Sequence, residues 1–551
     1  MRLIPYYILQ KEKDSMKKTI KVISLLVAAM LMLFIFAACK SQEPAESQSP
    51  GKTAATTEES TTTDEMTQEP VTLTYWVMLT PNASKALQSY NEHVVYIELQ
   101  KRLGINIEFE HPAIGQEDEQ FLLLISTNDL PDIIELALRS GNLYPGGPDK
   151  AIADGVFLKL NDIIDEYCPN YSALLNGNPE IKLQSTTDEG NIWAFNMVEE
   201  MRQPSWEGPV VRKDWLDEFG LALPETMDDW YEFLKMAKDE KDVQAPMLLE
   251  DTGVSAYHPF VSAYGVINDF YRDGAEAVHY GPIEEGFKQY LTTMNKWYSE
   301  ELIDSDFVSG FGDRTNALIT TGEAAGWVDG FWTFENYKKL ADDPDFTIVP
   351  TVYPTLNEGE EVTLRQHNEY VRDNPACITP SCENIEAAAA LLDYGYSDEG
   401  AALYGWGIEN MTYEVVDGNK VWTDFMIHNE EGFTFIETRN IYCRQSGPYI
   451  REWWAPLIAY TDVEVSAMND YWNGDDSGIL PNTLTLTAAE GDEYSKIMSD
   501  IDTYKAEMIV NFIMGIEPLD GFDEYVSQIK SMGIDDAIAI KQAALDRYNN
   551  R

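Results

Sequence analysis

The stretch VTLTYWV at Val71–Val77 opens the folded part of the chain and indicates its class. Apolar and polar residues alternate along it, and β-branched and aromatic residues dominate, which is typical of a strand. A helical pattern follows at 91–103, a second strand pattern at 105–109, a helical pattern at 117–127 and a short apolar strand at 132–136. This strand–helix–strand–helix–strand order predicts an α/β fold, with a parallel sheet covered by helices on both faces.

The rest of the chain is long enough for a second core. The chain has 551 residues, of which 44% are hydrophobic, and a single compact core rarely serves so long a chain. We therefore expect two lobes. Helical periodicity predicts further helices at 215–219, 227–238, 283–299, 385–394, 504–514 and 522–548.

The charge balance excludes one class of partner. Lys and Arg number 39 against 94 Asp and Glu, a formal net charge of −55. Nucleic acids attract basic surfaces and repel acidic ones, so we expect no nucleic-acid partner. The acidity is typical of a solvated surface that keeps an extracellular protein soluble.

The cysteines do not form a recognisable framework. Five are present, with no C-x-x-C pair and no Cys/His cluster at zinc spacing. Cys39 belongs to the N-terminal pattern described next. Among the other four cysteines, Cys377 and Cys382 are nearest to each other in the sequence. We expect them to be free buried thiols, with a disulfide between them as the alternative.

The N-terminal residues have the pattern of a secretory signal. A basic start at 16–21 precedes an apolar run at 23–36, and small residues then precede Cys39. The small residues directly before the cysteine resemble a bacterial lipobox. That resemblance implies cleavage after residue 38 and lipidation of Cys39; an ordinary signal peptide followed by a chance cysteine is the alternative.

Residues 39–70 follow as a predicted tether. From 41 onward they are rich in Ser, Thr, Glu, Gln, Pro and Ala and contain no aromatic residue. Such a segment cannot bury enough apolar surface to offset its chain entropy, so we expect it to be disordered. A signal, an anchor and a tether before a large folded part predict a protein displayed on the extracellular face of a membrane.

Several ordered motifs resemble one family. The step at 128–134 resembles the "G-D-x-P-D" motif of extracellular solute-binding proteins of bacterial ABC importers, and 322–332 resembles the "G-E-A-A … G-x-W" segment of their maltose-type members. The block at 211–226 resembles "R-K-D-W-L … G-L … P-x-T" of the LipO-like lipoprotein subgroup. Further matches in the same order lie at 190–195, 294–304, 397–400 and 543–548.

The resemblance implies a fold and a function. It implies a two-lobed periplasmic-binding-protein-like fold with a hinge and an interlobe cleft. The implied lobes are 71–194 with 350–405, and 195–349 with 406–551. The implied function is capture of an oligosaccharide by hinge closure and delivery to an ABC transporter. Its implied partners are two permease subunits and an ATPase. We expect a monomer.

Candidate ligand residues follow from sugar chemistry. Sugars need aromatic platforms and side chains that form paired hydrogen bonds. Trp332 matches the "G-x-W" position, whose indole stacks on sugar in the maltose-type proteins. The other candidates end predicted strands, lie in the same segment or occupy predicted cleft loops: Trp327, Asp329, Trp76, Glu135, Trp193, Trp206, Arg444, Trp453 and Trp454. For each, the alternative is a structural role in packing, because Trp is usually buried.

Other residues of the motifs have structural interpretations. We expect Arg212 and Asp214 to form an ion pair beside a packing Trp215. We see no basic cluster that would demand an acidic sugar. The segment 239–246 lacks the alternating ligands of a calcium loop, so we expect no metal site and no cofactor.

Alternative functions remain open at this point. No H-E-x-x-H, G-x-S-x-G, P-loop or dinucleotide fingerprint is present, so we expect no enzyme and no catalytic residue. The alternatives are a binding protein for peptides or other non-sugar solutes, a sensor-coupled or adhesive surface protein, and a secreted glycan hydrolase with an unrecognised pair of carboxylates.

Overall fold

The computed structural model describes residues 70–551 except 137–143, 145, 203, 250–257, 275, 311, 365, 367 and 473. The chain separates into two units, Met1–Gln68 and Glu69–Arg551. The predicted signal peptide at 1–38, the lipidated Cys39 and the tether up to residue 69 lie outside the described residues. The hydrophobic clusters of the described chain belong to the second unit, so this unit has a core of its own.

The first sheet of the second unit has six strands in the order β13-β4-β10-β3-β1-β2. Its strands are β1 (Thr72–Val77), β2 (Asn106–Glu110), β3 (Ile133–Glu135), β4 (Phe195–Glu199), β10 (Val371–Ile378) and β13 (Ile450–Arg451). Strand β1 pairs in parallel with β2 and β3, which confirms the predicted opening, whereas β10 runs antiparallel to β3 and β4.

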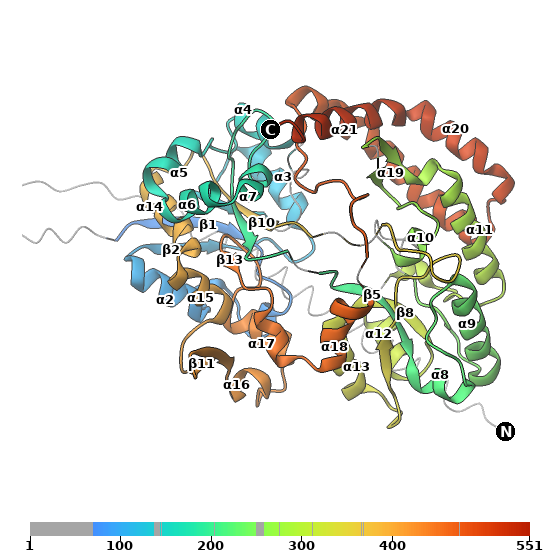
Figure 1. Cartoon of the computed structure of the whole chain (residues 1–551). Coiled ribbons are helices and arrows are strands. Elements are labelled where there is room, and N and C mark those ends of the chain that lie inside the picture. Colours follow the sequence, from blue (N-terminus) through green and yellow to red (C-terminus); the bar gives the residue numbers. More distant parts are fainter. Residues whose placement is uncertain are drawn as a thin grey trace, which may run out of the picture. The chain divides into compact units, whose positions relative to one another are not determined.

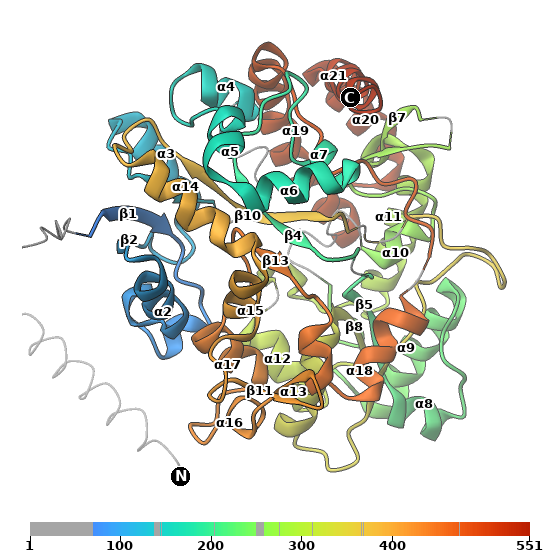
Figure 2. The same cartoon turned by 60° about the vertical axis from the view of Figure 1, so that its left-hand side comes forward.

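Helices cover both faces of this sheet. Figures 1 and 2 show α5 to α7 and α14 on one side of the strands and α2 and α15 on the other. Helix α2 ends where Gly104 takes a left-handed φ of 66°, which a residue without a Cβ adopts most easily. The helices of this region are α2 (Val94–Leu103), α3 (Glu117–Thr127), α4 (Gly147–Ala153), α5 (Asn161–Tyr167), α6 (Pro169–Gly177), α7 (Pro179–Gln184), α14 (Ile385–Asp393) and α15 (Asp398–Trp406).

A second sheet has three strands in the order β8-β5-β9. These are β5 (Glu207–Arg212), β8 (Gly326–Gly330) and β9 (Ile348–Pro350), and β5 runs antiparallel to both neighbours. The expected Arg212–Asp214 ion pair is confirmed at 2.5 Å, and the Arg212 guanidinium lies 4.2 Å from the Trp215 ring. The helices between these strands are α8 (Lys213–Phe219), α9 (Met227–Lys241), α10 (Pro259–Ser262), α11 (Glu285–Ser299), α12 (Asp313–Thr320) and α13 (Phe334–Leu340).

Two hairpins and the C-terminal helices complete the described chain. The hairpins are β6 (Phe270–Arg272) with β7 (Val278–Tyr280), and β11 (Tyr413–Val416) with β12 (Asn419–Trp422). The remaining helices are α16 (Asp424–Ile427), α17 (Phe435–Tyr442), α18 (Asp462–Ser466), α19 (Ala488–Met514), α20 (Phe522–Met532) and α21 (Ile534–Tyr548).

Two helix ends differ from the sequence patterns. Helix α19 begins well before the predicted 504, because Thr487 and Glu490 form a capping box that satisfies the first backbone N–H groups. The helical stretch predicted at 522–548 is divided at Gly533, whose φ of 105° ends α20 before α21 begins.

The chain runs from the six-stranded to the three-stranded sheet after β4 and returns between β9 and β10. After β13 it leaves the six-stranded sheet again for the C-terminal helices, which pack in one core with β5 and β8. Strands β4 and β13 pair within the six-stranded sheet, although the predicted boundaries assign their residues to the second lobe. Local periodicity cannot reveal this, because about 250 residues separate β13 from β4 in the sequence. The exact lobe boundaries stay a prediction.

Cysteines and helices agree with the sequence patterns. Cys168, Cys377, Cys382 and Cys443 are buried free thiols, which confirms the expectation for Cys377 and Cys382. No helix in the described ranges is both long and apolar enough to cross a membrane.

Candidate functional site

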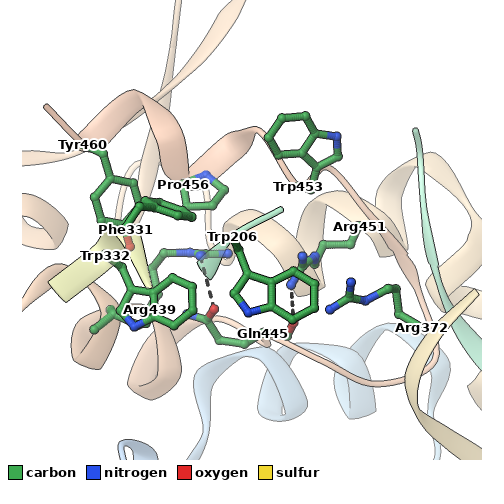
Figure 3. A pocket seen from close by; sticks show the side chains of 11 residues that line it. Trp206, Phe331, Trp332, Arg372, Arg439, Gln445, Arg451, Trp453, Pro456 and Tyr460 are labelled. Carbon is green, nitrogen blue, oxygen red and sulfur yellow. Dashed lines mark hydrogen bonds between the residues drawn. The ribbon is translucent and has the colours of Figure 1, made fainter. Parts of the chain in front are cut away.

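A cavity of about 200 Å³ lies between the two sheets. The six-stranded sheet supplies residues from β10 and β13, and the three-stranded sheet supplies the residue before β5 and two residues after β8. Helix α17, the segment between α17 and β13, and the segment after β13 complete the wall. The lining side chains, drawn in Figure 3, are Trp206, Phe331, Trp332, Arg372, Ile436, Arg439, Gln445, Arg451, Trp453, Pro456 and Tyr460.

Aromatic rings form one part of this wall. The Phe331 ring makes edge contacts with Trp332 at 5.3 Å and with Tyr460 at 5.1 Å between ring centroids. The Trp332 indole folds back over Gly330, where any Cβ would collide with the ring. Gly330 therefore leaves the space that the Trp332 indole occupies, and this explains the glycine two residues before the tryptophan. The indole remains half-buried, with its accessible part on the cavity.

The position of Trp206 is set by its backbone. Its N–H donates to Gln366 Oε1 at 3.0 Å, and its carbonyl accepts from the Phe331 N–H at 3.2 Å. The Arg372 guanidinium lies 4.5 Å from the centroid of the Trp206 ring. In Figure 3 this indole lies between Arg439 on one side and Arg372 with Arg451 on the other.

Three guanidinium groups form the polar part of the wall. Arg372 donates to Asn368 Oδ1, and Arg451 forms an ion pair with buried Glu199 at 2.7 Å. Arg439 is 4% exposed, and its Nη1 donates to Gln445 Oε1 at 3.2 Å. Burial lowers the pKa of Arg439. The structure thus corrects the expectation that no basic cluster exists, because β10 and β13 both pair with β4 and so bring Arg372 to the side of the cavity where Arg439 and Arg451 lie.

Three of the predicted ligand residues line the cavity: Trp206, Trp332 and Trp453. They come from different segments, and the fold brings them together.

Trp327 and Asp329 do not line the cavity. The Trp327 ring is fully buried and makes an edge contact with Tyr337 at 5.9 Å. Asp329 accepts a hydrogen bond from the Tyr337 hydroxyl at 2.6 Å, and burial raises the pKa of Asp329 to about 6. Both side chains of β8 therefore pack against Tyr337 of α13.

Trp76 and Trp193 also lie away from the cavity. Trp76 is buried and packs on Phe121 with ring centroids 6.3 Å apart. Trp193 stacks on Phe157 at 5.8 Å. Both tryptophans belong to one hydrophobic cluster beside the six-stranded sheet.

Glu135 and Arg444 meet each other instead of the cavity. They form an ion pair whose side chains are 1% and 4% exposed, and the Tyr75 hydroxyl donates to Glu135 at 2.8 Å. Burial alone would lower the pKa of Arg444, but Glu135 beside it holds that pKa above its usual value. This pair joins β3 to the segment after α17.

Trp454 points elsewhere than its neighbour Trp453. Its Nε1 donates to Glu200 at 3.2 Å, and its side chain is among the exposed large hydrophobic ones. It is not among the side chains that line the cavity.

Sequence reasoning missed most of the other lining residues. Arg451 and Tyr460 flank the predicted Trp453, and that proximity was the signal available for them. Gln445 directly follows the predicted Arg444, which was the same kind of signal. Nothing in the local sequence marks Arg372 or Arg439.

The lining residues can bind but carry few groups for bond making. They offer aromatic faces, guanidinium and amide donors, and no Asp, Glu, Ser, Cys or His. Within the described part of the chain, no group of three or more His, Cys, Asp or Glu could hold a metal ion.

Comparisons with known proteins agree with this architecture. The fructooligosaccharide ABC transporter substrate-binding protein FusA of Streptococcus pneumoniae is 23% identical, over 94% of this chain and 96% of its own. Lipoprotein LipO of Bacillus subtilis is 20% identical, over 79% of this chain and 85% of its own. The crystal structure of alginate-binding protein AlgQ2 without calcium ion has a TM-score of 0.71 and 22% identity, covering 87% of this chain and 99% of that one.

These likenesses confirm the predicted two-lobed, periplasmic-binding-protein-like α/β fold. The family model described as bacterial extracellular solute-binding protein matches residues 84–402, more than half of the chain. The resemblance seen in the ordered sequence motifs is therefore confirmed, and this chain belongs to the bacterial extracellular solute-binding protein family.

Proposed function

We propose that this chain captures an oligosaccharide outside the cell and delivers it to an ABC transporter. The observation that carries the proposal is the cavity between the two sheets, with aromatic faces on one part of its wall and hydrogen-bond donors on the other. Flat aromatic rings match the C–H faces of sugars, and planar polar groups match their hydroxyls. The names of FusA and AlgQ2, which bind fructooligosaccharide and alginate, support this ligand class.

Capture proceeds by closure of the two sheets on the ligand. Trp206 and Trp332 come from the three-stranded side of the cavity, and Arg372 and Arg451 come from the six-stranded side. A ligand that contacts both sides stabilises the arrangement in which they are close. The crossings after β4, between β9 and β10 and after β13 are the segments that would act as the hinge. No bond of the ligand is made or broken.

The anchor and the transporter partners belong to the same proposal. A signal peptide at 1–38 directs export and is removed, and a lipid on Cys39 then holds the protein at the extracellular face of the membrane. The tether lets the folded unit reach the transporter. Membership of an extracellular family and the likeness to lipoprotein LipO support this placement. The partners are two permease subunits and an ATPase, and the binding protein acts as a monomer.

The test is calorimetric titration of residues 69–551, which form a unit with its own core. The panel contains neutral oligosaccharides, acidic oligosaccharides and short peptides. We expect saturable binding to one saccharide class. Trp332→Ala should weaken that binding at least about 10-fold, or about 1.4 kcal/mol, because the ring lost is a platform.

The matched control is Trp454→Ala, since Trp454 is an exposed tryptophan that does not line the cavity. It should keep the wild-type affinity. Binding to peptides alone would retain the fold and overturn the ligand class. Turnover of a glycan by the purified protein would overturn the assignment as a binding protein.

A further inference from the structure

The cavity has a charge opposite to that of the protein. The chain carries 39 Lys and Arg against 94 Asp and Glu, yet the cavity wall contains three arginines and no acidic residue. The arginines lie on β10, α17 and β13, and Figure 3 shows their side chains at the cavity. Such a local reversal of charge favours a negatively charged ligand.

Arg439 is the strongest indication. It is 4% exposed, and no Asp or Glu in the described part of the chain forms an ion pair with it. Its Nη1 donates to the neutral Gln445, and its Nε is buried without a hydrogen-bond partner. A buried cation without a counter-charge is unfavourable, and an anion bound in the cavity would remove that cost.

The buried side-chain atoms of the wall that lack a hydrogen-bond partner are all donors. Besides Arg439 Nε, they are Gln445 Nε2 and Trp453 Nε1, each buried and without a hydrogen-bond partner. The orientation of the Gln445 amide follows from its oxygen, which accepts from Arg439. A sugar hydroxyl both donates and accepts hydrogen bonds, whereas a carboxylate only accepts them. A wall whose buried donors lack acceptors therefore suits a carboxylate better than a neutral sugar.

The other two arginines shape the place where the anion would lie. Arg451 forms an ion pair with buried Glu199 at 2.7 Å. This pair offsets the charge of Arg451 and fixes the position of its guanidinium beside the cavity. Arg372 is held by Asn368 and stacks on Trp206. Paired N–H groups of arginine match the two oxygens of a carboxylate.

We propose that the ligand is an oligosaccharide that carries a carboxylate, with Arg439 and Gln445 binding the carboxylate and Trp206 and Trp332 packing on the sugar ring. This inference rests on the proposed function and adds the charge of its ligand. The acidic group belongs to a uronic acid or a similar sugar acid, and the uncharged part of the same chain occupies the aromatic part of the wall.

The test compares acids with their own neutral esters. Residues 69–551 are titrated calorimetrically with oligogalacturonates, alginate oligosaccharides and glucuronic acid-bearing xylo-oligosaccharides, and with each compound after methyl esterification of its carboxylates. We expect one acid class to bind about 10- to 100-fold more tightly than its ester, as charge-assisted hydrogen bonds would produce. We also expect the affinity to fall as salt increases.

Variants locate the effect. Arg439→Gln should remove most of the difference between acid and ester. The control Arg102→Gln changes an exposed arginine that pairs with Glu98 away from the cavity, and it should keep the difference. The acid–ester comparison on the wild-type protein remains decisive if Arg439→Gln fails to fold.

The outcomes separate this inference from the proposed function. Equal affinity for acid and ester, or binding of neutral oligosaccharides alone, would overturn the carboxylate and leave the saccharide assignment standing. Equally tight binding of inorganic sulfate would show an anion site without saccharide recognition and would overturn the inference. The inference also fails if no acidic saccharide of the panel binds.

Discussion

The ion pair between Glu135 and Arg444 offers a sharp test of how this structure is held together. The two side chains are 1% and 4% exposed, so water hardly screens the charges, and the pair joins β3 to a segment more than 300 residues later. Glu135→Gln keeps the shape and the acceptor for the Tyr75 hydroxyl, but it leaves the Arg444 cation buried without its counter-charge.

The expected cost follows from that burial. Removing one partner of a buried pair destabilises a protein by about 3–5 kcal/mol, because the remaining charge stays uncompensated. The double variant Glu135→Leu with Arg444→Met removes both charges and should cost less than the sum of the two single variants. Glu98→Gln is the matched control, because its pair with Arg102 is largely exposed and such pairs contribute about 0–1 kcal/mol.

The assay is urea denaturation of residues 69–551, followed by far-ultraviolet circular dichroism and by tryptophan fluorescence. Coincident transitions justify a free energy of unfolding. If Glu135→Gln lowers the free energy of unfolding by less than about 1 kcal/mol, the reasoning is refuted, because a loss that small is typical of an exposed ion pair. Folded Glu135→Gln should bind ligand like the wild type, because Glu135 does not line the cavity; lost affinity would restore the ligand role that the sequence suggested.

Three further outcomes are expected. Burial raises the pKa of Asp329 to about 6, so its contribution to stability is present below about pH 4 and is lost as pH rises to about 6. In Asp329→Asn, the free energy of unfolding in urea should therefore change less with pH across this window. Gly326→Ala should cost about 1–3 kcal/mol in thermal or urea unfolding, because the new Cβ would lie 2.6 Å from the buried Trp230 ring, whereas Gly177→Ala meets no atom and should not destabilise. The four buried thiols of residues 69–551 should resist a water-soluble disulfide reagent in the native protein and react in urea; rapid labelling of the folded protein would contradict their burial.

The predicted ligand residues show where sequence reasoning holds. Trp332 was found through a motif with a steric basis, since its ring lies over Gly330. Trp206 and Trp453 are candidates because they lie in predicted cleft loops, and both line the cavity. Such positions lie at element ends, where side chains are free to face a ligand.

Other candidates show where reasoning from the sequence fails. Glu135 ends a strand at a plausible sheet edge, but Arg444 neutralises it from 309 positions away. Trp327 lies in the same segment as Trp332, yet it is within β8 and its ring is fully buried in the core, whereas Trp332 follows the end of that strand. Whether a polar or aromatic residue faces a ligand depends on what packs against it, and local sequence does not record that.

The sequence by itself determined the α/β class, the succession of the first strands and helices, and the family, because periodicity and motif order are local properties of the chain. Only the tertiary structure decided the charge of the cavity. Arg372, Arg439 and Arg451 lie on separate elements of an acidic chain. Arg372 and Arg451 come together because β10 and β13 both pair with β4, and Arg439 joins them at the cavity wall from helix α17. Hydrogen bonds between strands distant in sequence bring Arg372 and Arg451 together, and no local pattern specifies those pairings.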